Sequence, residues 1–140
     1  MRALLLALLV CGLTPAVPAQ DLKGFLQALR SDKGLSAPEW DPDLAASCEG
    51  RAAELAAGGQ LSHTDAQGRG PGLQAMALGL PPGDYGEVLG SGLSAAAVWA
   101  AWLASPPHRA VLLEPGWTKW GVGTAVYGDV TVFVLRLWRP

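Results

Sequence analysis

The stretch 120-WGVGTAVYGDVTVFVLRLW-138, in a chain of 140 residues, decides the fold class. It contains two runs of strand-forming residues, 120–126 and 130–138, separated by Tyr127-Gly128-Asp129. That arrangement is typical of a β-hairpin. The second run is apolar at almost every position. Because a strand with one solvated face alternates apolar and polar residues, this pattern predicts a strand that is covered on both faces.

Helical patterns precede the hairpin. Residues 21–30 form a short pattern with one apolar side, and a longer helix is expected between its N-cap Asp41 and the pair Gly58-Gly59. Further helices are expected at 94–104 and, opened by Ser105, at 106–113. Helices first and a hairpin last, with a doubly covered strand, predict a single α+β domain layered as helix, sheet, helix.

The segment from Leu61 to Gly92 is rich in Gly and Pro, and only 72–80 show a short helical pattern. A long irregular segment in a small domain is usually functional or disordered. Scattered apolar residues, together with Tyr85 and Leu89, favour order here. We therefore expect an ordered but irregular loop.

The first residues have the composition of a secretory signal peptide. Arg2 precedes the apolar run 3–13, and a tail of small residues ends at Ala19, so we expect cleavage there. The apolar run is too short to span a bilayer. The predicted organisation is a signal peptide at 1–19 and one domain at 20–140. The protein is expected to be secreted or periplasmic, monomeric, and without a transmembrane segment.

The two cysteines have different expected fates. Cys11 follows Val10, whereas the residue before a lipoprotein cysteine is usually small, so we do not expect lipid anchoring there. Cys48 is then alone. It lies on the apolar side of its helix, which favours a buried structural thiol over a reactive one.

The charge balance bears on possible partners. Removing Arg2 from the ten Lys and Arg leaves nine, against twelve Asp and Glu. No basic cluster is present, so nucleic acid is not an expected partner.

Three polar residues are candidates for a functional site by their type. They are His63 in 61-LSHTD-65, Glu87 in 85-YGEVLGSG-92, and His108 in 105-SPPHR-109. Their spacing alone does not bring them together.

The chain resembles the CAP superfamily, which includes cysteine-rich secretory proteins, insect venom antigen 5 and plant pathogenesis-related proteins, and especially its compact bacterial branch. Four pieces match in family order: LRSDKGLSAPEWDPDLAASCEGRAAELAAGGQLSHTDAQGR, YGEVLGSG, AWLASPPHRAVLLEPGWTKWGVG and a strand near the end. The resemblance implies a three-layer α-β-α sandwich with a cleft lined by two histidines and acidic residues. It places His63, Glu87 and His108 in that cleft.

Two positions depart from the family pattern. Val88 replaces the usual Asn after the glutamate, so whatever that amide does in relatives is absent here. Ser105 stands where many eukaryotic members carry a second glutamate, a change that bacterial relatives often share. The resemblance thus implies a triad of His63, Glu87 and His108.

The role of a helix N-cap is enough to explain a serine at position 105. Extended backbone suits a helix N-cap and is also what a following proline demands. A capping serine engages its oxygen with backbone N–H groups, which argues against Ser105 as a nucleophile. His108 then lies in the first helical turn, where the helix dipole favours the neutral imidazole that ligates metals.

Two interpretations of the triad stay open. His63, His108 and Glu87 would form a His₂Glu set with an open fourth position, the arrangement of catalytic zinc. Alternatively, the three side chains hydrogen-bond one another and tie the irregular segment to the helices. No cofactor is required in the second case.

The resemblance and the triad predict an exported binding module. Its ligand would be a lipid, a cell-envelope component or a protein, since some eukaryotic relatives bind sterols or lipids. The alternative is a metal-dependent or serine-type hydrolase that uses the same cleft, although neither G-x-S-x-G nor H-E-x-x-H occurs. A third possibility is a structural envelope protein with a vestigial cleft.

Two smaller predictions concern turns. Asp65, Gly68 and Arg69 are expected to form a turn rather than to bind a ligand. Among the tryptophans at 99, 102, 117 and 120, which are more often core than the lining of a groove, Trp117 and Trp120 around a second turn are the better candidates for partial exposure.

Overall fold

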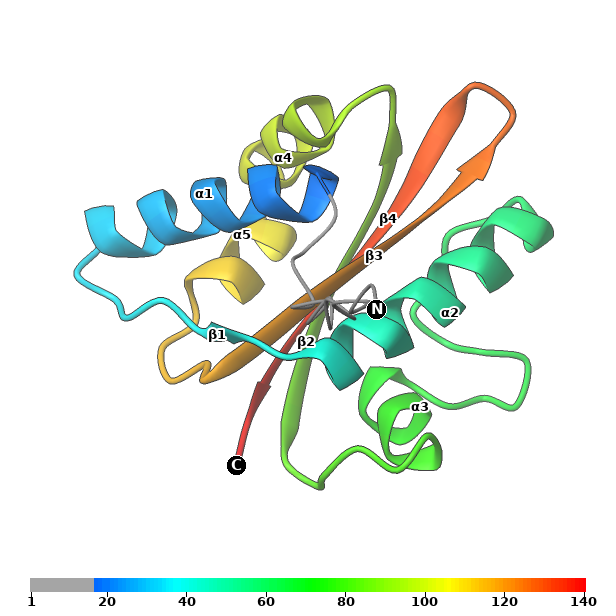
Figure 1. Cartoon of the computed structure of the whole chain (residues 1–140), viewed down its shortest axis with the longest axis horizontal. Helices are drawn as coiled ribbons and strands as arrows, with labels where there is room; N and C mark the ends of the chain where they lie inside the picture. Colours follow the sequence, from blue (N-terminus) through cyan, green and yellow to red (C-terminus); the bar gives the residue numbers. More distant parts are fainter. Residues whose placement is uncertain (1–16) are drawn as a thin grey trace, which may run out of the picture.

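The computed structural model describes residues 17–140. Cys11 and most of the predicted signal peptide lie outside the described residues. The elements in chain order are α1 (Val17–Asp32), β1 (Glu39–Trp40), α2 (Pro42–Gly58), α3 (Pro71–Ala77), β2 (Asp84–Gly92), α4 (Ala95–Ala104), α5 (Pro106–Leu113), β3 (Lys119–Tyr127) and β4 (Val130–Arg139) (Figure 1). None of the helices within this part of the chain is long and apolar enough to cross a membrane.

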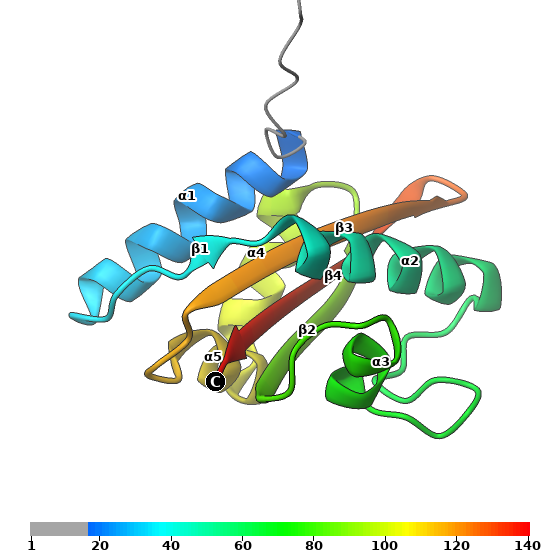
Figure 2. The same cartoon turned by 60° about the horizontal axis from the view of Figure 1, so that its bottom comes forward.

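The strands form one sheet in the order β1-β3-β4-β2. The predicted hairpin is confirmed, because β3 and β4 pair antiparallel from Tyr127↔Val130 outward. Strand β1 pairs parallel to β3, and β2 pairs antiparallel to β4 at the other edge. The edge strand β2 lies beside α3 (Figure 2).

Helices cover both faces of this sheet, as the apolar run of β4 predicts. Alternate residues of β4 enter different clusters: Phe133 and Leu135 pack with the buried residues of α1, α4 and α5, whereas Val132 and Val134 pack with those of α2. Figure 1 shows α2 and α3 on one side of the sheet and the other three helices on the opposite side. The predicted α+β domain, with its three-layer α-β-α sandwich, is confirmed.

The expected irregular loop up to Gly92 is wrong, because residues Asp84–Gly92 form a full strand, β2. Glycines at alternate positions hide its apolar pattern. A Cβ at Gly90 would lie 2.7 Å from Val98 Cγ1 and 2.9 Å from Trp102 Nε1. Glycine is therefore needed where α4 packs against the strand. The helical pattern at 72–80 becomes the shorter α3.

The ends of α2 agree with the prediction. Asp41 Oδ1 accepts hydrogen bonds from the N–H groups of Asp43 at 2.9 Å and Leu44 at 3.0 Å. Gly59 ends the helix with φ 68°. On the other face, α1 begins at Val17 rather than at residue 21, so it includes the predicted cleavage point; cleavage stays a prediction.

The expected partial exposure of Trp117 and Trp120 is wrong, since they are only 3% and 1% exposed. Trp117 donates its Nε1–H to the carbonyl of Val111 at 2.8 Å. Trp120 packs edge-on against Trp40 with 5.0 Å between ring centroids. Trp120 is a residue of β3 rather than of a turn, and both rings belong to the larger apolar core cluster.

Candidate functional site

Glu87 lies at the centre of a buried polar network on the α2 side of the sheet. Its side chain is 1% exposed. Oε2 accepts a hydrogen bond from Arg136 Nε at 2.8 Å, and the two residues are direct partners in the β2–β4 register. Because an unpaired buried carboxylate is very costly, Arg136 is what allows a charged Glu87 at this position.

Arg136 is the member of this network that sequence reasoning missed. It also donates from Nη1 to Ser47 Oγ at 3.2 Å and from Nη2 to Gln74 Oε1. A signal was present, because Arg136 is the one charged residue in the apolar run 130–138. A charge inside a strand covered on both faces requires a partner.

His63 contacts the same carboxylate from the loop between α2 and α3. Its Nδ1 lies 2.7 Å from Glu87 Oε1, while its own side chain is 54% exposed. Gln74 Nε2 donates to the carbonyls of His63 and Arg69, each at 2.8 Å, which anchors the loop. The carboxylate holds the ring by Nδ1 and leaves Nε2 as the nitrogen for a ligand.

Ser105 and His108 form a second pair. Ser105 has the expected extended backbone at the start of α5, with φ −101° and ψ 112°. Its Oγ, however, makes no capping hydrogen bond and lies 2.7 Å from His108 Nδ1. The expectation that capping engages this oxygen is wrong. An N-cap side chain bonds the second or third N–H of the helix, and Pro107 has no N–H at the second position.

The two pairs come from elements on different sides of the sheet, since His63 lies in the loop before α3 and His108 lies in α5. Glu87 faces α2 and binds His63. A Cβ on its neighbour Gly86 would lie 3.0 Å from Val111 Cγ1 of α5, one helical turn beyond His108. Successive strand residues point to opposite faces, so Glu87 faces α2 and Gly86 faces α5.

The described residues do not assemble His63, Glu87 and His108 as three direct metal ligands. Within residues 17–140, no three His, Cys, Asp or Glu side chains are grouped to hold a metal ion. Both oxygens of Glu87 are already bonded, to His63 and to Arg136. The contacts agree with a polar network in which Glu87 positions His63. Zinc binding stays a prediction, and the ring nitrogens left for it are the two Nε2 atoms.

The loop after His63 turns as predicted. Asp65 Oδ1 accepts the N–H groups of Gln67 and Arg69 at 2.9 Å each, and Oδ2 accepts from Arg69 Nε at 2.8 Å. Gly68 has φ 77°. Although burial acts to raise the pKa of Asp65, the hydrogen bonds from Arg69 and Gln67 outweigh it and hold the pKa below its usual value.

Cys48 is a buried free thiol, as predicted. Its Sγ lies 3.5 Å from the carbonyl oxygen of Gly121. Burial raises the pKa of Cys48 to about 12; nearby Glu87 adds to the rise and Arg136 opposes it. A thiol in this environment contributes to the packing of the core and does not act as a nucleophile.

Comparison with known proteins gives a family and a fold. The sequence model of the cysteine-rich secretory protein family, CAP, matches residues 25–137. A search of curated protein sequences gives no match. An outer surface protein from Borrelia burgdorferi is similar in structure, with a TM-score of 0.79 and 25% identity, covering 86% of this chain and 90% of that one.

Two more distant structures show the same fold. An extracellular protein containing an SCP domain from Bacillus anthracis has a TM-score of 0.77 and 22% identity, covering 88% of this chain and 40% of its own. The chain therefore spans less than half of that protein. Venom allergen-like protein 4 from Schistosoma mansoni has a TM-score of 0.70 and 12% identity, covering 89% and 90%.

Proposed function

Because the chain belongs to the cysteine-rich secretory protein family, CAP, we propose that it works as an exported binding module. Its ligand is a lipid, a cell-envelope component or a protein, held in a cleft between His63 with Glu87 and Ser105 with His108. Export is supported by the signal-peptide pattern of residues 1–19 and by the extracellular and outer-surface proteins that share the fold.

The observation that carries this proposal is the contrast in exposure within one hydrogen-bonded pair. Glu87 is 1% exposed and His63 is 54% exposed, with 2.7 Å between them. A network that only stabilised the fold has no need of an exposed imidazole. Here a buried ion pair holds a surface ring in one orientation, which lowers the entropic cost of binding a ligand to it.

One observation favours hydrolysis as a second candidate function, namely the 2.7 Å contact between Ser105 Oγ and His108 Nδ1. A serine nucleophile also needs an acid that orients its histidine. Among the hydrogen bonds of residues 17–140, the ring of His108 contacts Ser105 and no carboxylate, and Glu87 is engaged elsewhere. The pair is suited to binding a polar group more than to catalysis.

The test of binding is a comparison of molecules that co-purify with the protein from its native host. Solvent extraction and mass spectrometry would identify them for the wild type, for the double variant His63→Ala, His108→Ala, and for Arg109→Gln. Arg109 is exposed on α5 and serves as the matched control. We expect a ligand that the double variant loses and the control keeps. A ligand retained equally by all three proteins overturns the proposal.

Two further measurements separate the alternatives. If the cleft binds zinc, titration of the wild type should show a site of micromolar or tighter affinity, and the His63→Ala, His108→Ala variant should lack it. Weaker binding, or binding unchanged in the variant, excludes a zinc site at these histidines. A screen of peptide, ester and cell-wall substrates tests hydrolysis. The hydrolase alternative fails if any turnover survives Ser105→Ala and His108→Ala.

A further inference from the structure

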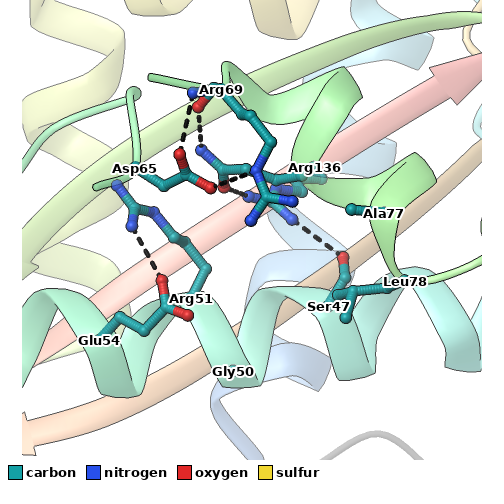
Figure 3. Close-up of a pocket in the computed structure, with 10 residues that line it drawn as sticks. Ser47, Gly50, Arg51, Glu54, Asp65, Arg69, Ala77, Leu78 and Arg136 are labelled. Atoms are coloured by element: carbon teal, nitrogen blue, oxygen red, sulfur yellow. Dashed lines mark hydrogen bonds and ion pairs between the residues drawn. The ribbon is translucent and has the colours of Figure 1, made fainter. Parts of the chain in front are cut away.

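A pocket of about 250 Å³ lies beside the buried network, on the α2 side of the sheet. Its walls come from α2, from α3, from the loop between them, and from β4 (Figure 3). Three arginines line it, Arg51, Arg69 and Arg136. Neither histidine of the proposed ligand cleft is part of the lining.

Arg136 has donors left over at the buried end of this pocket. Its three hydrogen bonds, to Glu87, Ser47 and Gln74, use one N–H from each nitrogen. A guanidinium group has five N–H donors. One N–H on each Nη atom therefore has no acceptor among the described residues, in the planar arrangement that matches an oxyanion, and the side chain itself is 1% exposed.

Arg69 has available donors at the open end. Its Nε is held by Asp65 at 2.8 Å, and the side chain is 40% exposed. The Nη atoms make one long contact, 3.5 Å from Nη2 to Gln67 Oε1. Figure 3 shows the guanidinium of Arg69 extending into the pocket toward α2, held in place by Asp65.

Arg51 adds to the excess of donors over acceptors. Nη2 donates to the carbonyls of Ser62 and Thr64, and Nη1 donates to Glu54. Its Nε is buried and has no acceptor among the described residues. A buried donor without a partner is costly, so the α2 wall of the pocket has unmet hydrogen-bonding capacity.

The charges and the volume of the pocket together restrict which ligand can fit. Two carboxylates, Glu54 and Asp65, line the pocket beside the three guanidinium groups, and Glu87 offsets Arg136 from behind. The pocket has no large positive field for a polyanion. Its volume is also below the roughly 300–1,000 Å³ of a site for a drug-sized ligand. One carboxylate or phosphate group on a small molecule fits both limits.

Gly50 is a small, exposed lining residue of this pocket. It lies inside α2, where glycine costs about 1 kcal/mol relative to alanine. A Cβ at Gly50 would meet nothing within 4 Å, so packing against the rest of the protein does not require glycine here. The glycine lines the pocket, and its missing side chain leaves room for a ligand.

We propose that this pocket binds a small oxyanion, a carboxylate or phosphate group, between Arg69 and Arg136. The ligand oxygens accept the N–H groups that these two residues do not use within the protein. The site is separate from the histidines of the proposed ligand cleft, and it stands whether or not that cleft binds a ligand.

Calorimetric titration with inorganic phosphate and with succinate tests the proposal and tells phosphate from carboxylate. We expect saturable binding of at least one anion, weakened about tenfold or more by Arg69→Gln, since a charge-assisted hydrogen bond is worth roughly 1.5–3 kcal/mol. Arg109→Gln removes the same charge outside the pocket and is expected to bind like the wild type. Binding of neither anion at millimolar concentration overturns the proposal, as does equal weakening in both variants.

A second variant tests the pocket without changing a charge. Gly50→Leu places a side chain into the space and keeps a good helix former in α2, so the thermal midpoint is expected to hold or rise. Anion binding is expected to be lost. A folded Gly50→Leu protein that binds as tightly as the wild type shows that the anion binds elsewhere and contradicts the proposal.

Discussion

The two faces of the sheet bury different kinds of side chain. The face toward α1, α4 and α5 is filled by large apolar residues, among them Trp99, Trp102 and Phe133. The face toward α2 has a smaller cluster of Cys, Ala, Leu and Val, and beside it lie the buried Glu87 and Arg136. The first face is organised for stability, and the second gives up apolar burial to hold charged groups in fixed positions.

This difference indicates how a small domain combines a stable core with a polar site. Large apolar contacts on one face provide the free energy of folding. The other face can then bear the desolvation of Glu87 and Arg136. Glu87 orients His63 at the surface, and its ion pair with Arg136 holds that guanidinium beside the pocket. Substitutions on the two faces should therefore have different consequences for stability and for binding.

The largest expected effect is on the apolar face. Trp102 is buried, and its Nε1–H donates to the carbonyl of Leu89 at 2.8 Å. Trp102→Ala should lower the free energy of unfolding by about 3–5 kcal/mol, because it leaves a cavity and an unpaired carbonyl. Urea unfolding measures the loss. The exposed Leu93 is the control, and Leu93→Ala should change stability by less than about 0.5 kcal/mol.

The next effect concerns the buried ion pair. Arg136→Met removes the guanidinium that pairs with the buried Glu87 carboxylate and leaves it only its contact with His63, and we expect a loss of about 3 kcal/mol in the same urea experiment. The double variant Glu87→Leu, Arg136→Met should recover most of that loss, since apolar replacement of both charges removes their desolvation cost. A double variant as unstable as the single one would mean that the pair stabilises the fold on balance.

A smaller effect appears at high pH through Cys48. Burial raises its pKa from 9.0 to about 12, so the unfolded chain loses the thiol proton first. The stability due to the protonated thiol is complete below about pH 9 and is lost as pH rises toward 12. Cys48→Ala should therefore show a shallower decline in unfolding free energy across this window. Identical declines in both proteins would show that the thiol is not buried as described.

The smallest effect is local and occurs in acid. The lowered pKa of Asp65 means that its contribution is present above the ordinary value of 3.8 and is lost as pH falls through the folded value. Amide exchange at Gln67 and Arg69 should accelerate there, because both N–H groups donate to Asp65 Oδ1. In Asp65→Asn the rates should lack this acid dependence once intrinsic exchange is subtracted. An unchanged profile contradicts the assignment.

The layered fold was predictable because the run 130–138 is apolar on both faces, and Asp41 with Gly59 marked the ends of α2. Strand β2 was not, since glycines at alternate positions remove the apolar pattern of one face. The reason for those glycines is tertiary: side chains from α4 and α5, and Trp117, occupy the space where a Cβ would lie.

The candidate site was predictable only in part. Family resemblance pointed to His63 and Glu87, which are in contact, and to His108, whose ring contacts Ser105 instead. Sequence reasoning assigned the oxygen of Ser105 to a backbone cap, but Pro107 removes one of the donors and the oxygen binds His108 instead. The contacts of Arg136 bring together residues of α2, α3, β2 and β4, and no local pattern encodes such a meeting.

The central claim is that Glu87 and Arg136 serve to position binding groups rather than to stabilise the fold. The most direct test is ligand retention by the double variant Glu87→Leu, Arg136→Met, purified from the native host beside the wild type. We predict a folded protein, with stability close to that of the wild type, that no longer carries the ligand found on the wild type. A stable double variant that retains this ligand in full would contradict the claim.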